Sequence, residues 1–280
     1  MRALLLGAGG MLGHDLARTA PPRTDLHAFT RQELDITATR ALAACVSDLR
    51  PDVILNTAAY TAVDRAETER DLCFRVNAEA VGELGRLASR AGARVVQFST
   101  DYVFDGKASR PYREDSPTDP VNAYGASKLA GEKALEESGA DRLIVRTQWL
   151  FGVNGKSFPR TMWERARAGL ETKVVRDQTG RPTYSHDLAF AVWALIGRGA
   201  SGVVHAANDG QATWFDVAAR VFAHAGRTDL LSACSTVDFP TPARRPTYSV
   251  LDTTRCEQEF AERLPPWDQA VERFLAGVAG

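Results

Sequence analysis

The sequence predicts an α/β fold, in which a doubly wound parallel sheet is combined with a smaller, interleaved C-terminal domain. Two observations favour this fold. Short apolar runs alternate with segments of helical periodicity through the first 150 residues, and a glycine-rich turn directly follows the first apolar run. Repeated strand–helix–strand units imply parallel strands with helices on both faces of the sheet. The length of 280 residues, of which 44% are hydrophobic, suits a fold with a substantial core.

Each element of the first half is predicted from its pattern of apolar residues. Buried parallel strands appear as short continuous apolar runs, whereas helices show apolar residues three and four positions apart. Leu42, Val46 and Leu49 have this helical spacing. Pro21 and Gly92 stand where helices would end. The predicted strands are residues 3–6, 26–29, 52–56, 94–98 and 143–146, and the predicted helices are residues 11–20, 37–49, 78–91 and 124–137.

The pattern changes after Trp149. The stretch 239–246 contains three prolines and must be extended or looping. Further helices are predicted at residues 158–168, 185–196, 213–225 and 267–276, with extended segments at 173–175 and 203–205. We therefore divide the chain into a core at residues 1–150 and a second part at residues 151–280, and we expect residues 180–206 to return to the core.

Composition and charge exclude several classes of protein. The chain has 34 Lys and Arg against 35 Asp and Glu, so its formal net charge is −1 and it lacks the basic excess typical of nucleic-acid-binding proteins. No apolar run approaches the ~18–20 residues of a membrane span. The four cysteines form no Cys-x-x-Cys pair, which favours reduced thiols over a zinc site or a disulfide framework. We therefore expect a cytoplasmic protein that binds neither nucleic acid nor membranes.

A glycine-rich turn marks the predicted cofactor site. Gly7, Gly10 and Gly13 follow the first strand and open the first helix. Glycines in this context allow a tight turn and bring backbone N–H groups close to a pyrophosphate, and the helix N-terminus adds a favourable dipole. Residues 1–150 are thus predicted to form a dinucleotide-binding Rossmann-type core, and residues 151–280 are expected to be mainly a substrate-binding domain.

The end of the second predicted strand bears on the choice of cofactor. An acidic residue there favours NAD by binding the adenosine ribose, whereas a nearby arginine accommodates the extra phosphate of NADP. This chain has Thr30 and Arg31 at that point. Arginine forms forked hydrogen bonds with phosphate, so we predict NADPH as the cofactor, and NADH stays open as the alternative.

Thr100, Tyr124 and Lys128 form the predicted catalytic group. Tyr124 and Lys128 are four residues apart and so share one face of a predicted helix. An ammonium group beside a phenol favours the phenolate and lowers the pKa of the phenol. A tyrosine tuned in this way delivers a proton to an oxygen that develops negative charge. Thr100 ends the fourth strand and therefore lies at the carboxyl edge of the sheet, where ligands bind in open α/β folds.

These residues resemble those of the extended short-chain dehydrogenase/reductase superfamily, which shares the glycine-rich turn and the Tyr-x-x-x-Lys pair. Other segments are similar to those of a narrower family, the dTDP-4-dehydrorhamnose reductases, and Ser-Thr-Asp-Tyr-Val-Phe-Asp-Gly at 99–106 is highly characteristic of that family. The remaining segments are residues 56–64, 146–151, 177–183 and 240–246. The resemblance extends from residue 2 to about residue 275.

The resemblance implies an oxidoreductase that uses NAD(P)H to reduce the C4 ketone of dTDP-4-dehydro-6-deoxy-L-mannose (dTDP-4-dehydrorhamnose), giving dTDP-L-rhamnose. It implies that Tyr124 donates a proton to the C4 oxygen, that Lys128 binds the nicotinamide ribose, and that Thr100 hydrogen-bonds near the reacting oxygen. Taken with the glycine-rich turn, it predicts cofactor contacts at Gly7, Gly10, Met11, Leu12, Gly13, Thr30, Arg31, Asp35, Ile36, Ala58, Ala59, Tyr60, Thr61, Tyr124 and Lys128. It implies substrate contacts at Val63, Thr100, Asp101, Tyr102 and Trp149.

Other interpretations stay open. A reductase of another nucleotide-linked 4-keto-deoxysugar has the same motifs, and so has a non-catalytic NADP-binding regulatory subunit of this fold. An epimerase is disfavoured, because it needs a further acid/base pair and no Cys/His pair stands near the catalytic residues. Asp64 is interpreted as the cap of a helix, and Arg244 and Arg245 either as a solvated pair or as diphosphate ligands. We predict no metal site, and either a monomer or a homodimer.

Overall fold

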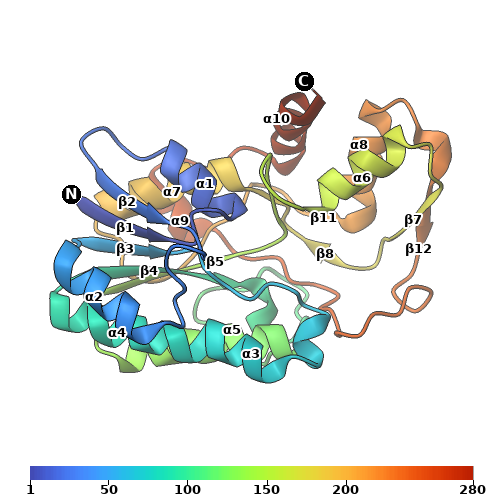
Figure 1. The fold of residues 1–280 in the computed structure, drawn as a ribbon. Helices are drawn as coiled ribbons and strands as arrows, with labels where there is room; N and C mark the ends of the chain where they lie inside the picture. The colour runs from blue at the N-terminus through green and yellow to red at the C-terminus, as the bar shows by residue number, and fades with distance from the viewer. Residues whose placement is uncertain (280) are drawn as a thin grey trace.

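The computed structural model describes residues 1–279 and has a six-stranded parallel sheet at its centre (Figure 1). Every neighbouring pair of strands in this sheet is parallel. The direction of chain progression reverses between β1 and β3, and such a switch point leaves a crevice outside the carboxyl ends of the strands. The predicted doubly wound sheet is confirmed. Its strands, in spatial order, are β2 (Asp25–Phe29), β1 (Arg2–Leu6), β3 (Val53–Asn56), β4 (Arg94–Thr100), β5 (Arg142–Thr147) and β10 (Gly202–His205).

Helices cover both faces of the sheet. Alternate residues of a strand point to opposite faces, so Leu5 packs in the core beneath one helical layer while Leu4 and Ile54 pack beneath the other. Burial on both faces explains why these strands appear in the sequence as unbroken apolar runs. One layer contains α1 (Met11–Arg18), α7 (Ser185–Gly197) and α9 (Thr254–Phe260), and the other contains α2 (Thr39–Leu49), α4 (Ala80–Ala91) and α5 (Ala123–Glu137) (Figure 1).

Two helices, α2 and α4, begin two residues later than predicted. Helix α2 begins at Thr39 rather than at residue 37, because the carboxylate of Asp35 accepts hydrogen bonds from the backbone and hydroxyl of Thr37 and holds the chain in a turn. Helix α4 is preceded by a 3-10 turn η1 (Arg65–Glu67), a short helix α3 (Arg70–Phe74) and a π-helical turn η2 (Arg75–Glu79). Residues 65–77 were not predicted to be helical, because their many charged residues leave no clear apolar periodicity.

The second half of the chain builds a separate lobe, which packs around its own apolar core (Figure 1). The chain leaves the sheet after β5, enters this lobe and returns to the sheet twice. The first return forms α7 and β10, and the second forms α9. The lobe contains β6 (Leu150–Phe151), α6 (Phe158–Arg167), β7 (Thr172–Val175), β8 (Thr179–Gly180), β9 (Thr183–Tyr184), β11 (Ala212–Thr213), α8 (Trp214–His224), η4 (Thr228–Leu230), β12 (Leu231–Cys234) and α10 (Trp267–Ala279).

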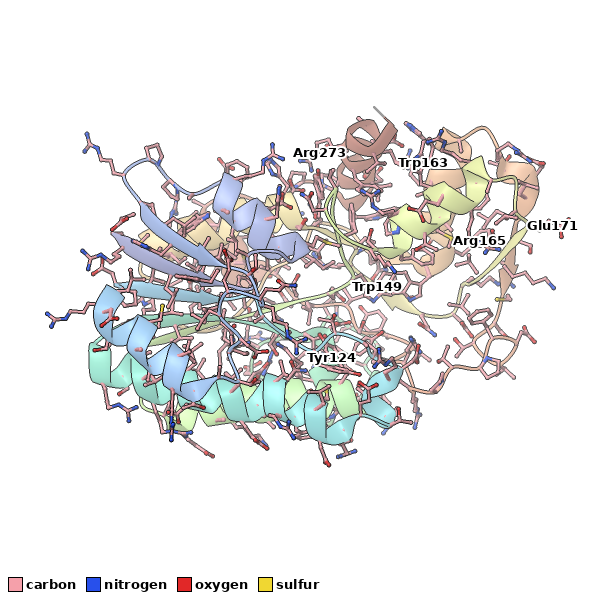
Figure 2. The ribbon with its side chains drawn as sticks, in the orientation of Figure 1. Tyr124, Trp149, Trp163, Arg165, Glu171 and Arg273 are labelled. Atoms are coloured by element: carbon pink, nitrogen blue, oxygen red, sulfur yellow. The ribbon has the colours of Figure 1, made fainter. Side chains whose placement is uncertain are left out.

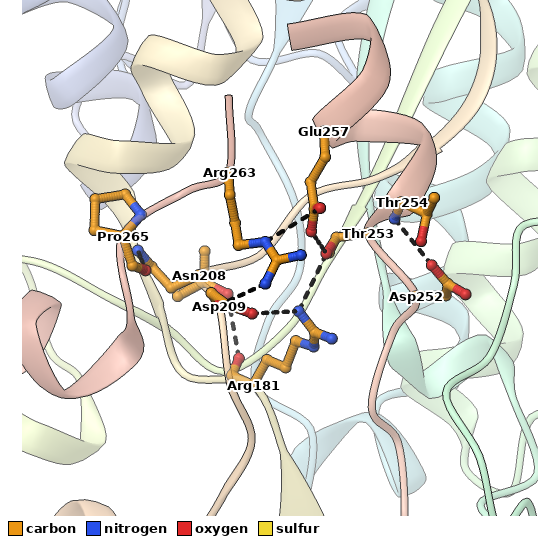
Figure 3. Close-up of polar contacts among 10 residues, drawn as sticks. Arg181, Asn208, Asp209, Asp252, Thr253, Thr254, Glu257, Arg263 and Pro265 are labelled. Carbon is orange, nitrogen blue, oxygen red and sulfur yellow. Dashed lines mark hydrogen bonds and ion pairs between the residues drawn. The ribbon is translucent and has the colours of Figure 1, made fainter. Parts of the chain in front are cut away.

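A polar cluster joins segments that are far apart in the sequence where the chain returns to the sheet (Figure 3). Arg181 donates a hydrogen bond of 3.1 Å to the hydroxyl of Thr253, and its guanidinium lies 3.8 Å from the carboxylate of Asp209. Arg263 pairs with Asp209 and Glu257 at 3.3 and 3.2 Å. The cluster therefore ties the loop after β8, the loop after β10 and helix α9 to one another.

A buried ion pair connects helix α5 with strand β5. Glu132 of α5 accepts two hydrogen bonds from Arg146 of β5, at 2.9 and 2.6 Å, and both side chains are only about 5% exposed. The guanidinium of Arg146 also lies over the ring of Phe104 and donates to the carbonyl of Glu114. A buried pair with this forked geometry is compensated only while both partners are present.

We expect Glu132→Ala to reduce the free energy of unfolding by ~3–5 kcal/mol, because it leaves the Arg146 guanidinium buried without its carboxylate. The matched control is Glu136→Ala on the same helix, whose carboxylate is 66% exposed and pairs with Arg142 at the surface. That change should cost less than ~1 kcal/mol. Urea unfolding followed by circular dichroism measures both. Equal losses in the two variants would contradict the assignment.

Candidate active site

Two adjoining cavities form a groove along the carboxyl ends of β1, β3, β4 and β5. Their volumes are about 520 and 490 Å³, and Gly10, Thr57 and Ala59 line both of them. The groove therefore continues from one cavity into the other across the switch point of the sheet. An elongated, two-part ligand suits this shape.

All the predicted cofactor residues line this groove. The first cavity is lined by Gly10, Met11, Leu12, Gly13, Ala59, Thr61, Tyr124 and Lys128. The second is lined by Gly7, Gly10, Thr30, Arg31, Asp35, Ile36, Ala58, Ala59 and Tyr60.

The glycine-rich turn brings backbone groups to the floor of the groove. Gly7 has a φ of +80°, and the hydroxyl of Thr57 donates to its carbonyl oxygen at 3.1 Å. A Cβ atom at Gly13 would overlap that same oxygen, so α1 can approach the turn this closely only with glycine at this position. Gly10 is the N-cap of α1 and has no side chain to bind the first N–H groups of the helix. These groups are oriented to bind an anion.

The second cavity is polar at the end of β2. Arg31 is largely exposed and pairs with Asp35 at 3.1 Å. The backbone N–H and the hydroxyl of Thr30 both donate to Glu33 at 2.8 Å. The guanidinium of Arg31 is therefore held at the mouth of the cavity by a partner four residues away.

Two elements bring the predicted catalytic residues into the first cavity. Thr100 is the last residue of β4, and Tyr124 and Lys128 lie one turn apart on α5. The side chain of Asn122 caps α5 by accepting a hydrogen bond from Gly125 N–H at 2.8 Å, which sets where the helix begins. Burial lowers the pKa of Lys128 to about 8, although the carboxylate of Glu132 opposes this shift.

The pKa of Tyr124 corrects one prediction. Burial raises this pKa above its ordinary value, and the nearby carboxylate of Asp101 raises it further, while the hydroxyl of Thr100 has the opposite effect. The expected lowering of this pKa by Lys128 is therefore wrong for this structure. A phenol with a raised pKa keeps its proton at neutral pH and so has a proton to donate, but it is a weaker acid than a phenol in water.

The predicted substrate residues fall into two groups. Thr100 and Trp149 line the first cavity. Asp101 and Tyr102 are buried behind it, and neither they nor Val63 line the first, second or third of the described cavities. The ring of Tyr102 meets the ring of Tyr124 edge-on, with centroids 6.1 Å apart. Asp101 and Tyr102 can therefore affect the first cavity only through the residues they contact, Thr100 and Tyr124.

Asp101 carries an unusual charge environment. It is 2% exposed, and one of its carboxylate oxygens accepts a hydrogen bond from Thr100 at 3.0 Å. Burial raises the pKa of Asp101 to about 7, although hydrogen bonds from Ser249 and Thr100 act in the opposite direction. This carboxyl therefore titrates near neutral pH, next to the hydroxyl that faces the cavity.

A third cavity of about 560 Å³ lies in the C-terminal lobe. Its walls include the aromatic side chains of Phe158, Trp214 and Phe239 and the cationic side chains of Arg165 and Lys173. The combination of flat apolar surfaces with cations suits a ligand that has a planar ring and anionic groups.

One residue that organises the site, Asn77, was not predicted from the sequence. Asn77 lies in the π-helical turn η2 and is almost completely buried. Its amide accepts from the N–H of Tyr60 at 2.9 Å and donates to the carbonyl of Tyr60 at 3.0 Å and to the hydroxyl of Ser127 at 2.9 Å. It therefore joins the loop after β3 to the part of α5 between Tyr124 and Lys128. A lone asparagine in a segment without periodicity has no recognisable pattern.

The interpretation of Asp64 as a helix cap is wrong. Its side chain caps no helix and instead accepts two hydrogen bonds from Arg245, at 3.0 and 2.9 Å, and one from Ala243 N–H. Arg245 is therefore not part of a solvated pair, whereas Arg244 is exposed. The ion pair connects the loop after β3 with the proline-rich segment of the second half.

The cysteines and the potential metal-ligating side chains are further candidates for parts of a site. All four cysteines are free thiols. Among residues 1–279, no group of three or more His, Cys, Asp or Glu side chains is arranged to hold a metal ion. Over the same range, no helix has the length and apolar character needed to cross a membrane.

Comparisons with known proteins agree with this geometry. The family model described as RmlD substrate binding domain matches residues 1–279. The chain is 42% identical to dTDP-4-dehydrorhamnose reductase of Burkholderia thailandensis, over 97% of both chains. It is also 42% identical to a probable dTDP-4,6-dihydroxy-2-methyloxan-3-one 4-ketoreductase of Streptomyces antibioticus, over 99% of this chain and 96% of the relative.

A solved structure extends the comparison to the fold. The crystal structure of dTDP-4-dehydrorhamnose reductase from Bacillus anthracis in complex with NADP superposes with a TM-score of 0.95 and 36% identity, and the match covers 98% of each chain. The family resemblance inferred from the sequence is thus confirmed over the whole fold. The chain belongs to the dTDP-4-dehydrorhamnose reductase family, that of the RmlD substrate binding domain.

Proposed function

We propose that this protein is an NADPH-dependent oxidoreductase that reduces the C4 ketone of dTDP-4-dehydrorhamnose to give dTDP-L-rhamnose. The observation that carries the proposal is that Thr100, Tyr124 and Lys128 line the same cavity as the start of α1. The proposed proton donor, Tyr124, therefore lies in the same cavity as the proposed dinucleotide site. The names of the full-length relatives supply the substrate class. A cytoplasmic location and a monomeric or homodimeric state stay predictions.

The residues of the groove fit NADPH. The only charged side chains that line the first cavity, among the described residues, are Lys128 and Lys156, both cationic. We assign the pyrophosphate to Gly10, Met11 and Leu12, and the adenosine to the second cavity beside Asp35 and Ile36, with the 2′-phosphate near Arg31. NADPH supplies the hydride that C4 of the sugar accepts. The NADP complex of the Bacillus anthracis relative supports this choice of cofactor.

Tyr124 is proposed to act as the proton donor. Reduction adds a hydride to C4 and a proton to the oxygen, so the ketone becomes a secondary alcohol. Tyr124 gives its phenolic proton to that oxygen, and the ammonium group of Lys128 offsets the negative charge left on the phenolate. Thr100 is placed to donate a hydrogen bond near the reacting oxygen. Since the pKa of Lys128 is about 8, its side chain is mostly protonated at neutral pH.

The C-terminal lobe is proposed to bind the nucleotide. In the third cavity, Trp214 and Phe239 offer flat surfaces for the thymine base, and Arg165 and Lys173 offer cations for the diphosphate. Trp149 lies between this cavity and Tyr124, where the sugar would have to pass. We therefore propose that residues 1–150 bind mainly the cofactor and that the lobe binds mainly the sugar nucleotide.

The name of one relative supports an alternative substrate. The Streptomyces antibioticus relative is also 42% identical to this chain, and the substrate in its name lacks the hydroxyl at C2 of the sugar. A 2-deoxy-4-ketosugar is therefore the alternative substrate, with the same reaction at C4.

The first test measures NADPH consumption with dTDP-4-dehydro-6-deoxyglucose and a 3,5-epimerase, which together generate dTDP-4-dehydrorhamnose. We expect turnover only when the epimerase is present, because the epimerised sugar is the proposed substrate. The 2-deoxy analogue is assayed in parallel. A kcat/KM higher for the 2-deoxy analogue would assign the alternative substrate. NADPH binding without turnover of either sugar would favour the non-catalytic regulatory subunit.

We expect Tyr124→Phe to lower kcat by ~10²–10⁴-fold, because the variant lacks the acidic proton but keeps the ring. Its affinity for NADPH should be unchanged, as measured by fluorescence titration. Tyr248→Phe is the matched control, since Tyr248 lines none of the three cavities and should retain full activity. Wild-type turnover in the Tyr124 variant would exclude its role as the acid.

The raised pKa of Asp101 makes the free energy of unfolding of this protein depend on pH. Its folded pKa of about 7 exceeds its unfolded value of about 3.9, so the fold disfavours the ionised form. We therefore expect wild type to lose stability relative to Asp101→Asn as the pH rises from about 4 to about 7, by at most ~1.4 kcal/mol per pH unit.

Urea unfolding at several pH values in this range measures the difference between wild type and Asp101→Asn. Asp115→Asn serves as the control, because the Asp115 side chain is 76% exposed and its replacement should leave the pH profile unchanged. A constant difference between wild type and the Asp101 variant across the range would show that Asp101 ionises normally.

A further inference from the structure

We propose that Trp214 is a positioning residue, which holds the indole of Trp149 beside Tyr124 and makes its orientation depend on what occupies the third cavity. This inference rests on the proposed function, since it concerns how the nucleotide end of the substrate affects the reacting end. It assigns a role to a stacked pair of indoles rather than to either tryptophan alone.

The two indoles form the wall between two cavities. Their ring centroids are 3.7 Å apart and their planes differ by 9°, so the rings are stacked face to face. Trp149 lines the first cavity together with Tyr124, whereas Trp214 lines the third cavity. In Figure 2, Trp149 lies at the junction of the sheet and the C-terminal lobe, above Tyr124. A ligand that spans both cavities must pass this pair.

The backbone of Trp149 is strained. Its φ is +47°, in the left-handed region that costs a non-glycine residue ~1–3 kcal/mol. Such a conformation persists only where surrounding contacts impose it. The contacts here come from Trp214 and from Gly180, where an added Cβ would lie 2.6 Å from the Trp149 indole. Trp149 lies in the bend between β5 and β6, and the lobe residues Trp214 and Gly180 pack against its indole.

Trp214 is in turn oriented by residues of the third cavity. Its indole N–H donates to the side-chain oxygen of Gln178 at 3.1 Å, and the amide nitrogen of Gln178 donates to the hydroxyl of Thr236 at 3.0 Å. The ring of Phe158 meets Trp214 edge-on, with centroids 4.7 Å apart. Phe158 and Gln178 both line the third cavity. A nucleotide bound there therefore contacts the groups that set the plane of Trp214.

This arrangement gives the remote part of the substrate a way to affect the reaction. Binding energy from a non-reacting group raises kcat when it orients the reacting centre. A base and diphosphate seated in the third cavity would stabilise Trp214, and Trp214 would hold Trp149 against the sugar next to Tyr124. If Trp214 served only to pack the lobe, its loss would lower stability without a specific loss of kcat.

The kinetic test compares Trp214→Leu with Trp214→Phe. We expect Trp214→Leu to lower kcat by ~10–100-fold while the affinity for NADPH stays unchanged, because misorientation near the reacting atoms is costly. Trp214→Phe keeps a stacking ring and should recover most of the activity. Trp163→Leu is the control, since Trp163 packs beside His224 and lines none of the three cavities. Wild-type kcat in Trp214→Leu would overturn the proposal.

A double-mutant cycle tests whether Trp214 acts through Trp149. The kcat of the double variant Trp149→Leu, Trp214→Leu should equal that of Trp149→Leu alone, because removal of the first indole leaves the second nothing to position. Multiplicative losses would show that the two tryptophans act independently and would overturn the proposal.

A binding experiment separates this inference from the proposed reaction. We expect dTDP alone to change the tryptophan fluorescence of wild type and of Trp163→Phe. The change should be markedly smaller in Trp149→Phe, although Trp149 does not line the nucleotide cavity. This result would support the indole linkage even if no ketosugar were reduced. An undiminished change in Trp149→Phe would overturn the linkage even if turnover were normal.

Discussion

The position of helix α5 is the constraint on which the rest of the site depends, because it carries both Tyr124 and Lys128. Three interactions hold it. Its N-terminal end is capped by Asn122, its middle is hydrogen-bonded through Ser127 to Asn77, and its last turns are attached to β5 by the buried pair of Glu132 with Arg146. The cap sets where α5 begins, Asn77 connects the helix to η2, and Arg146 connects it to β5, so these contacts restrict how α5 can slide or rotate against the sheet.

Burial, more than charge pairing, sets the chemistry of the groups around this helix. It raises the pKa of Tyr124 and Asp101 and lowers that of Lys128, so each group is shifted toward its neutral form relative to water, although Lys128 stays mostly protonated at neutral pH. A neutral phenol is what a proton donor requires. The same desolvation makes the charges that develop during reduction respond strongly to nearby dipoles, and the groove provides these at Thr100 and at the start of α1.

The second lobe is built by excursions of the chain from the sheet, and several contacts join the two parts. The pair of Asp64 with Arg245 joins the loop after β3 to the proline-rich segment. The stack of Trp149 on Trp214 joins the loop after β5 to α8. The cluster around Arg181 and Asp209 holds the returning segments behind them. A substrate that spans the lobe and the sheet would therefore be bound by surfaces whose relative position is already determined.

The sequence by itself determined the parallel sheet and the glycine-rich turn and predicted the proposed catalytic group, because these depend on local periodicity and on residues a few positions apart, such as Tyr124 and Lys128. It did not reveal the π-helical turn that places Asn77, the partner of Asp64, the stacking of Trp149 on Trp214 or the direction of the Tyr124 pKa shift. Each of these depends on residues brought together from distant parts of the chain, or on how completely a group is removed from water. Only the tertiary structure decides such contacts and burial, since neither leaves a repeating pattern along the chain.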